Sequence, residues 1–266
     1  MAPQRHVHAK AFLFAYMLSP SAPATASLSF DGLFRGGAVL QRGAEVIVWG
    51  KANPASSQSR PIQLELDGAL VASAAVDGSG RWHAALPPQA AAWSRLLRAS
   101  DVRSGASAET EVSFGEVLLC SGQSNMQMSV SAKPGQFAAE NGTQEAAAAT
   151  RYTGKISLAA VNGRSNPPGL WNGTGCGQYS PPTCRNKLTW NKATPATVSA
   201  FSAVCWYTGR DLFERLGGSV PIGLMCGAIG GSPIEWWLPP GHVNNSICGL
   251  DKPPCDPKQF FDGDFF

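Results

Sequence analysis

Short apolar runs separated by turn residues fill the first part of the chain, residues 27–113. The run Ile62–Leu66 alternates apolar and polar positions and leads into Asp67-Gly68, a pair typical of tight hairpins. A second glycine-containing turn follows at Asp77–Gly80, and no 3.6-residue period is visible in this region. The spacing of these runs predicts a small all-β sandwich.

The pattern becomes mixed in residues 114–266. Val117–Cys120 is wholly apolar, as expected for a central strand of a parallel sheet, and Val220–Ala228 is a second apolar run. Between them, residues 199–216 show a helical period that Gly217-Gly218 ends. The apolar face of this helix is predicted to hold Phe201, Val204, Leu212 and Leu216. Strand, turn, helix, strand and turn in this order predict an open α/β sheet, whose ligands lie at the carboxyl ends of the strands.

The N-terminus has the three parts of a secretory signal peptide. A basic segment precedes the apolar stretch Ala11–Leu18, which is too short to span a membrane. Small residues at Ala24 and Ala26 predict cleavage before Ser27. A disordered tail is the alternative for residues 1–26. The signal predicts entry into the secretory pathway, with extracellular or lysosomal residence left open and no membrane attachment after cleavage.

Charge argues against a nucleic-acid partner. Arg5 and Lys10 are two of the 21 basic residues, and residues 1–26 hold no acidic residue, so 19 basic and 18 acidic residues remain after cleavage. No basic run survives in that remainder. Nothing in the sequence fixes an oligomeric state.

Seven cysteines follow the signal, and an oxidising compartment permits disulfides. Two close pairs in Gly- and Pro-rich segments are candidate local bridges: Cys176 with Cys184, and Cys248 with Cys255. Cys120, Cys205 and Cys226 lie in apolar runs and are predicted to be buried thiols. Because no CxxC motif or histidine at ligand spacing is present, we expect no metal site. Three Asn-x-Ser/Thr sequons mark candidate glycosylation sites at Asn141, Asn172 and Asn244.

Two turns carry the candidate chemistry. Ser124 follows the apolar run Val117–Cys120 by four residues, a spacing that can expose a nucleophile at the edge of a sheet. The simpler interpretation of Ser124 alone is a helix N-cap. Gly230-Gly231 follows the second apolar run and would let backbone approach a ligand, although an ordinary tight turn has the same composition.

Taken together, these segments resemble the sialate O-acetylesterases, a branch of the SGNH hydrolases. The string CSGQSNM at 120–126 looks like the nucleophile block of that family, and GGSPIEWW at 230–237 looks like its glycine block. Three further segments match in the same order: AVLQRGAEVIVWG at 38–50, DGSGRWHAALPP at 77–88 and FSAVCWYTGRDLFERL at 201–216.

The resemblance implies a β-sandwich followed by a three-layer α/β/α, flavodoxin-like SGNH domain. It also implies hydrolysis of O-acetyl esters on sugars, most often 9-O-acetyl sialic acid, without a cofactor. Ser124 would be the nucleophile, and its backbone N–H, with that of Gly230 or Gly231, would stabilise the oxyanion. Within the two matched blocks, Gln123, Asn125 and Glu235 are candidate substrate-binding residues.

The sequence departs from the family in its catalytic base. Members of the family carry a third block and an Asp-x-x-His block after the glycine block, and neither is found before the chain stops at Phe266. His242 is the histidine nearest the glycine block and is expected to be a surface residue. A serine without its base is a poor nucleophile, so we expect this truncated chain to be nearly inert. A short form that only binds acetylated glycans, and an esterase of plant polysaccharide acetates, are the alternatives.

Overall fold

A computed structural model of the protein describes residues 27–53, 61–131, 138–160 and 190–228. The predicted signal peptide, the four cysteines of the two predicted local bridges and the glycine block at 230–237 lie outside these residues. The described part of the N-terminal region contains β1 Ser27–Phe30, the 3-10 turn η1 Gly32–Phe34, β2 Ala38–Gln41, β3 Val46–Asn53, β4 Pro61–Leu66, β5 Ala69–Ala75, β6 Arg81–Leu86, β7 Ala92–Asp101 and β8 Ser107–Gly122. The following elements are α1 Ser124–Gln127, α2 Gly142–Ala148, η2 Ala149–Tyr152, β9 Ile156–Ala160, β10 Asn191–Lys192, α3 Pro195–Ser199, α4 Ala203–Arg215 and β11 Ile222–Ala228.

The N-terminal strands form two sheets around one core, as the short alternating runs predict. One sheet has the order β1-β3-β6, and β8-β7-β4-β5 forms one side of a larger sheet, with β2 parallel to β8. The hairpin between β4 and β5 turns at Asp67 and Gly68, whose φ angles of 50° and 83° fit the predicted tight turn. Alternate side chains of both sheets meet in the core, where the largest fully buried ones are Phe34, Ile62, Leu64, Trp82, Leu86, Leu97 and Phe114.

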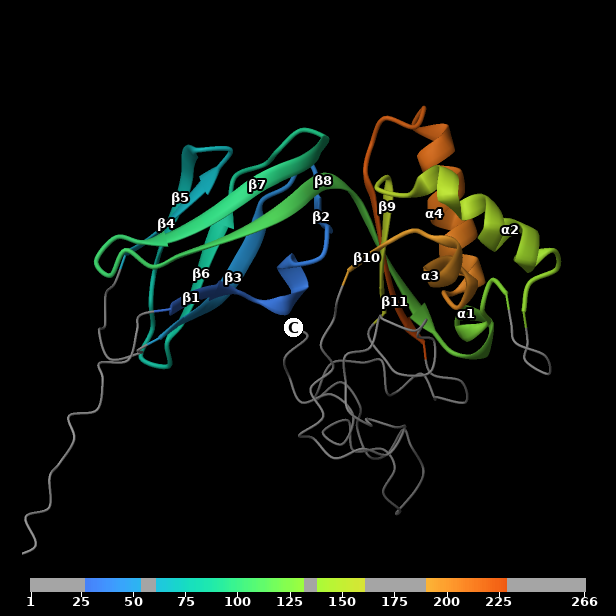
Figure 1. The fold of residues 1–266 in the computed structure, drawn as a ribbon, viewed down its shortest axis with the longest axis horizontal. Coiled ribbons are helices and arrows are strands. Elements are labelled where there is room, and N and C mark those ends of the chain that lie inside the picture. The colour runs from blue at the N-terminus through green and yellow to red at the C-terminus, as the bar shows by residue number, and fades with distance from the viewer. Residues whose placement is uncertain (1–26, 54–60, 132–137, 161–189, 229–266) are drawn as a thin grey trace, which may run out of the picture.

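The strand β8 connects this region to the helical part of the molecule (Figure 1). Its first half pairs with β7 and β2, whereas residues from Glu116 onward pair in parallel with β11. The change of partner occurs at Gly115, where an added Cβ would lie 1.9 Å from the carbonyl oxygen of Pro221. Only glycine therefore allows β8 and the segment before β11 to approach each other this closely. The division into domains at residues 27–113 and 114–266 stays a prediction.

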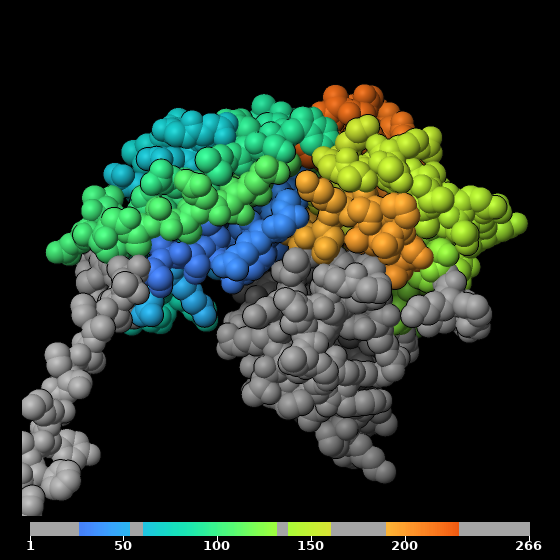
Figure 2. All heavy atoms as spheres, viewed as in Figure 1, coloured from blue at the N-terminus to red at the C-terminus, as the bar shows by residue number. Residues whose placement is uncertain are grey.

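The second half of β8 joins β11 and β9 in a parallel group, confirming the mixed α/β class. Alternate residues of β9 and β11, including Leu158 and Leu224, face a core shared with the helices. Ala159 and Met225 face the opposite way and pack against the N-terminal core. In the described residues, α1 to α4 gather on one side of this sheet (Figure 1), and the strands and helices form one continuous body (Figure 2).

The helix predicted over residues 199–216 is shorter than predicted, since α4 spans Ala203–Arg215 and α3 ends before it at Ser199. Helix α4 begins after Ser202, whose Oγ accepts a hydrogen bond from the backbone N–H of Cys205 and caps the helix. The predicted apolar face is wrong at one position: Val204 is exposed, whereas Phe201 is buried and Leu212 and Leu216 pack against the same core. Cys205 and Trp206 are buried as well. The predicted end is confirmed, because Gly217 and Gly218 adopt positive φ angles.

Candidate functional site

The candidate nucleophile lies at the carboxyl end of β8. Gly122 ends the strand with a φ of 148°, a conformation that glycine adopts most readily, and α1 begins two residues later at Ser124. The side chains of Gln123, Ser124 and Asn125 are all exposed. Strand, glycine turn and short helix thus place Ser124 at an accessible edge of the sheet, as the sequence predicts.

The hydroxyl of Ser124 has one polar partner within the described residues. Its Oγ donates a hydrogen bond of 2.8 Å to Oε1 of Gln123. A neutral amide oxygen can accept this hydrogen bond but cannot remove the proton, so Gln123 orients the hydroxyl without activating it. Gln123 therefore contacts the candidate nucleophile directly. Its role in substrate binding stays a prediction, as does that of Asn125.

The carboxyl end of β11 lies beside this turn. Ala228, the last residue of β11, is paired with Gly122 in the register of the two parallel strands. Gly230 and Gly231 follow two and three residues later in the sequence, and they lie outside the described residues, as does Glu235. The two apolar runs found in the sequence are therefore neighbouring strands whose carboxyl ends meet at one edge, where ligands of α/β sheets bind.

No histidine of the described residues lies at this edge. His83 is on β6 and pairs with Trp49 of β3, in the separate three-stranded sheet. The other three histidines, His242 among them, lie outside the described residues. The described residues also contain no group of three His, Cys, Asp or Glu side chains that could hold a metal ion.

A disulfide joins Cys120 to Cys205, with 5.8 Å between their Cα atoms. The prediction of buried thiols at these two positions is therefore wrong, although it holds for Cys226, which is free and buried. Burial raises the pKa of the Cys226 thiol to about 11, which keeps it protonated and unreactive at neutral pH. Sequence reasoning missed the bridge because its cysteines are 85 residues apart, and connectivity cannot be deduced from spacing.

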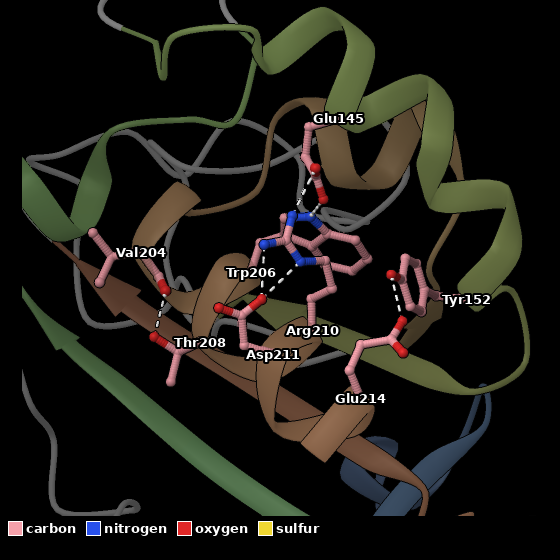
Figure 3. Close-up of polar contacts among 8 residues, drawn as sticks. All are labelled: Glu145, Tyr152, Val204, Trp206, Thr208, Arg210, Asp211 and Glu214. Atoms are coloured by element: carbon pink, nitrogen blue, oxygen red, sulfur yellow. Dashed lines mark hydrogen bonds and ion pairs between the residues drawn. The ribbon is translucent and has the colours of Figure 1, made fainter. Parts of the chain in front are cut away.

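Polar contacts between α2 and α4 support the helical side of the site (Figure 3). Trp206 is fully buried, and its indole Nε1 donates a 2.7 Å hydrogen bond to Glu145 of α2. The other carboxylate oxygen of Glu145 lies 2.7 Å from the guanidinium of Arg210. Nearby, the Tyr152 hydroxyl donates to Glu214. These contacts fix α4, which carries Cys205, against the rest of the helical layer.

One predicted glycosylation site is described by the structure. Asn141 is exposed, has a φ of 57° and makes no capping hydrogen bond through its side chain at the start of α2. It lines a shallow hollow of about 320 Å³ beside Ser131 and Thr143. Asn172 and Asn244 lie outside the described residues, and glycosylation at all three positions stays a prediction.

Part of the chain is similar in sequence to known acetylesterases. The chain is 33% identical over 147 residues to the sialate O-acetylesterase of Pongo abelii and 32% identical over 149 residues to that of Homo sapiens. The chain resembles the sialate O-acetylesterases. Each alignment covers 53% of this chain and 24% of the relative, so the chain spans about a quarter of the relatives' length. No family model matches the chain.

A solved structure extends the similarity to the fold. The crystal structure of a carbohydrate acetylesterase from Xanthomonas citri matches with a TM-score of 0.61 and 29% sequence identity. The match covers 79% of this chain and 42% of that one. Both similarities are to acetylesterases. Within the part of the chain that the structure describes, no helix is long and apolar enough to cross a membrane.

Proposed function

We propose that this chain is part of a serine esterase that removes O-acetyl groups from sugars. The observation that carries the proposal is the exposed Ser124 at a strand-to-helix turn, within a chain that resembles acetylesterases in sequence and fold. Ser124 Oγ attacks the acetyl carbonyl and forms an acyl-enzyme, the sugar hydroxyl leaves, and water then releases acetate. No cofactor takes part in this reaction.

The oxyanion of the tetrahedral intermediate needs hydrogen-bond donors fixed before the reaction. The backbone N–H of Ser124 is one proposed donor, and Gly230 or Gly231 supplies the other. The pairing of Gly122 with Ala228 supports this assignment, because it brings the strand before Ser124 beside the strand before Gly230. We further propose that Gln123, Asn125 and Glu235 contact the sugar.

The catalytic base is the part of the mechanism that the described residues do not supply. His83 belongs to a different sheet, and none of the four histidines in the sequence follows an aspartate by three residues. In another serine hydrolase, loss of the histidine lowers turnover by about a millionfold. We therefore propose that the 266-residue chain alone hydrolyses esters only weakly.

For the substrate we propose 9-O-acetyl sialic acid, since the relatives matched in sequence are named sialate O-acetylesterases. For the location we propose the secretory pathway, with extracellular or lysosomal residence. The Cys120–Cys205 disulfide supports this location, because such bridges form and persist in oxidising compartments.

The test is acetate release from 9-O-acetyl sialic acid by the wild-type chain, Ser124→Ala and Ser121→Ala. Ser121 is a matched control, since it is an exposed serine at the end of β8, three residues before Ser124. Weak release by wild type and Ser121→Ala that disappears in Ser124→Ala supports the proposal. Equal release by all three proteins contradicts it. Rapid, Ser124-dependent release shows instead that the chain contains its own base, and His242→Ala is then the variant to measure.

The second candidate substrate is an acetylated plant polysaccharide, favoured by the structural match to a protein described only as a carbohydrate acetylesterase. Acetylated xylan in the same assay separates the two. Faster Ser124-dependent release from xylan than from sialic acid moves the assignment to that class.

A further inference from the structure

The turn that carries Ser124 has little packing of its own. Among the residues of α1, none is buried, and the side chains of Ser121, Gln123 and Asn125 are exposed as well. Two backbone hydrogen bonds close the turn, from Gln127 N–H to the Gln123 carbonyl and from Met128 N–H to the Ser124 carbonyl. An exposed turn of this kind opens easily unless the segments on either side are held.

The segment after Ser124 is held by residues 201–203, which lie at the start of α4. Val130 N–H donates to the Phe201 carbonyl at 2.9 Å, and Ala203 N–H donates to the Met128 carbonyl at 2.8 Å. We call residues 123–127 the nucleophile turn. Both hydrogen bonds join its exit, residues 128–130, to residues 201–203.

A buried serine adds a third contact at the same place. Ser202 is fully buried, and its Oγ lies 3.3 Å from the sulfur of Met126 while it also caps α4. The exit of the nucleophile turn is therefore fixed to the start of α4 by backbone and side-chain contacts together.

The segment before Ser124 is held at the same place by a covalent bond. Cys120 lies four residues before Ser124 and is bonded to Cys205, in the first turn of α4. Both cysteines are buried, at 8% and 1% exposure. Entry and exit of the turn are thus anchored to one five-residue segment, 201–205, on the helical side of the sheet.

Strand pairing alone does not provide this anchor. Pairing with β11 holds Cys120 within the plane of the sheet, opposite Cys226, but it does not fix the height of α4 above the end of β8. The disulfide ties the first turn of α4 to the end of β8, and the contacts from residues 126–130 to 201–203 then set where the turn can lie.

We propose that the Cys120–Cys205 disulfide is a positioning element for Ser124, holding both ends of the nucleophile turn to the start of α4. The importance of this disulfide for catalysis rests on the proposed esterase function, whereas its effect on the position of the turn does not. Loss of the bridge leaves Cys120 held only by noncovalent contacts, its pairing with β11 and its packing in the core, and the turn then samples orientations in which Ser124 is misplaced.

The test is amide hydrogen exchange in the full chain, comparing wild type with Cys120→Ala/Cys205→Ala. We expect the amides of residues 121–131 to exchange about tenfold faster in the double variant, while peptides from β3 and β6 change little. The first control is Cys226→Ala, which alters a buried sulfur at the same level of the sheet and keeps the bridge.

A second control separates positioning from general stability. Phe213→Leu destabilises the same core from the far end of α4, where Phe213 packs against Tyr152. The proposal requires faster exchange at 121–131 in the double variant than in Phe213→Leu at equal loss of melting temperature. If the double variant fails to fold, reduction of the folded wild type with a phosphine reductant, monitored by intact mass, gives the same comparison.

The outcomes also distinguish this proposal from the esterase function. Equal exchange at 121–131 in the double variant and in Phe213→Leu overturns the positioning role. Selective exchange at 121–131 upholds that role even if no Ser124-dependent acetate release is found, a result that contradicts the esterase proposal alone. Where release is measurable, the double variant should lower kcat with little change in KM.

Discussion

Gly115 is the residue at which β8 changes partner from β2 to β11, and its lack of a side chain is a steric requirement. A Cβ here would lie 1.9 Å from the Pro221 backbone oxygen, which belongs to the turn before β11 and cannot rotate away. We predict that Gly115→Ala destabilises the protein by about 3 kcal/mol, as overpacking against backbone does. Gly78→Ala is the control, since no atom lies within 4 Å of its added Cβ, and it should change stability by less than about 0.5 kcal/mol. Equal effects in urea unfolding would contradict this account.

Glu116, the next residue, makes stability depend on pH. Hydrogen bonds from Gln41 and from the Arg42 guanidinium lower the pKa of its carboxyl group. Folding lowers this pKa, so the ionised Glu116 carboxylate contributes to the free energy of unfolding. This contribution is complete above the pKa that Glu116 has in the unfolded chain, and it is lost as pH falls through the pKa that Glu116 has in the folded protein. The difference in unfolding free energy between wild type and Glu116→Gln should therefore be constant near neutral pH and shrink in acid.

Urea unfolding of both proteins from neutral pH to pH 3 measures this difference. Glu109→Gln is the comparison variant, since the Glu109–Arg98 pair is exposed and 3.8 Å apart and should contribute little at any pH. A difference for Glu116→Gln that grows in acid would be incompatible with the hydrogen bonds described.

At the scale of elements, Glu145 links α2 to α4 through Trp206 and Arg210. Glu145→Ala leaves the buried Trp206 N–H without a partner, and we predict a loss of about 2–3 kcal/mol. Glu145→Gln keeps an acceptor oxygen and should cost less than half as much. Asp211→Ala removes the other, exposed partner of Arg210 and should be nearly neutral. Thermal unfolding checks this order, and Glu145→Gln as damaging as Glu145→Ala would refute the role of the indole hydrogen bond.

Local sequence signals predict the ends of elements well where the residue type is itself required by the backbone conformation. Asp67 and Gly68 adopt the positive φ angles for which such turn residues are selected, and Gly217 ends α4 for the same reason. The signal fails for Val204, which is exposed although Phe201, Leu212 and Leu216 of the same predicted face pack on the core. Apolar character alone does not decide which residues at the edge of a helix face are covered, because that depends on the neighbouring elements.

At the scale of the whole molecule, the sequence predicts the β-rich and α/β parts but not how they join. β8 continues through the predicted boundary near residue 114. One strand therefore pairs with β7 of the β-rich part and with β11 of the α/β part. The Cys120–Cys205 disulfide could not be predicted for a similar reason, because it depends on how α4 packs on β8. In contrast, the position of Ser124 was predictable, because an apolar strand followed by a glycine turn places the next residues at the sheet edge.

We propose Ser124 as an esterase nucleophile that is held in place while the described residues supply no base for it. The most direct measurement is acetate release from 9-O-acetyl sialic acid with added imidazole, which supplies an external base. We predict that imidazole increases release by the wild-type chain and by Ser121→Ala in a concentration-dependent way, and that Ser124→Ala stays at the level of imidazole without protein. Equal release by wild type and Ser124→Ala at every imidazole concentration would contradict the claim.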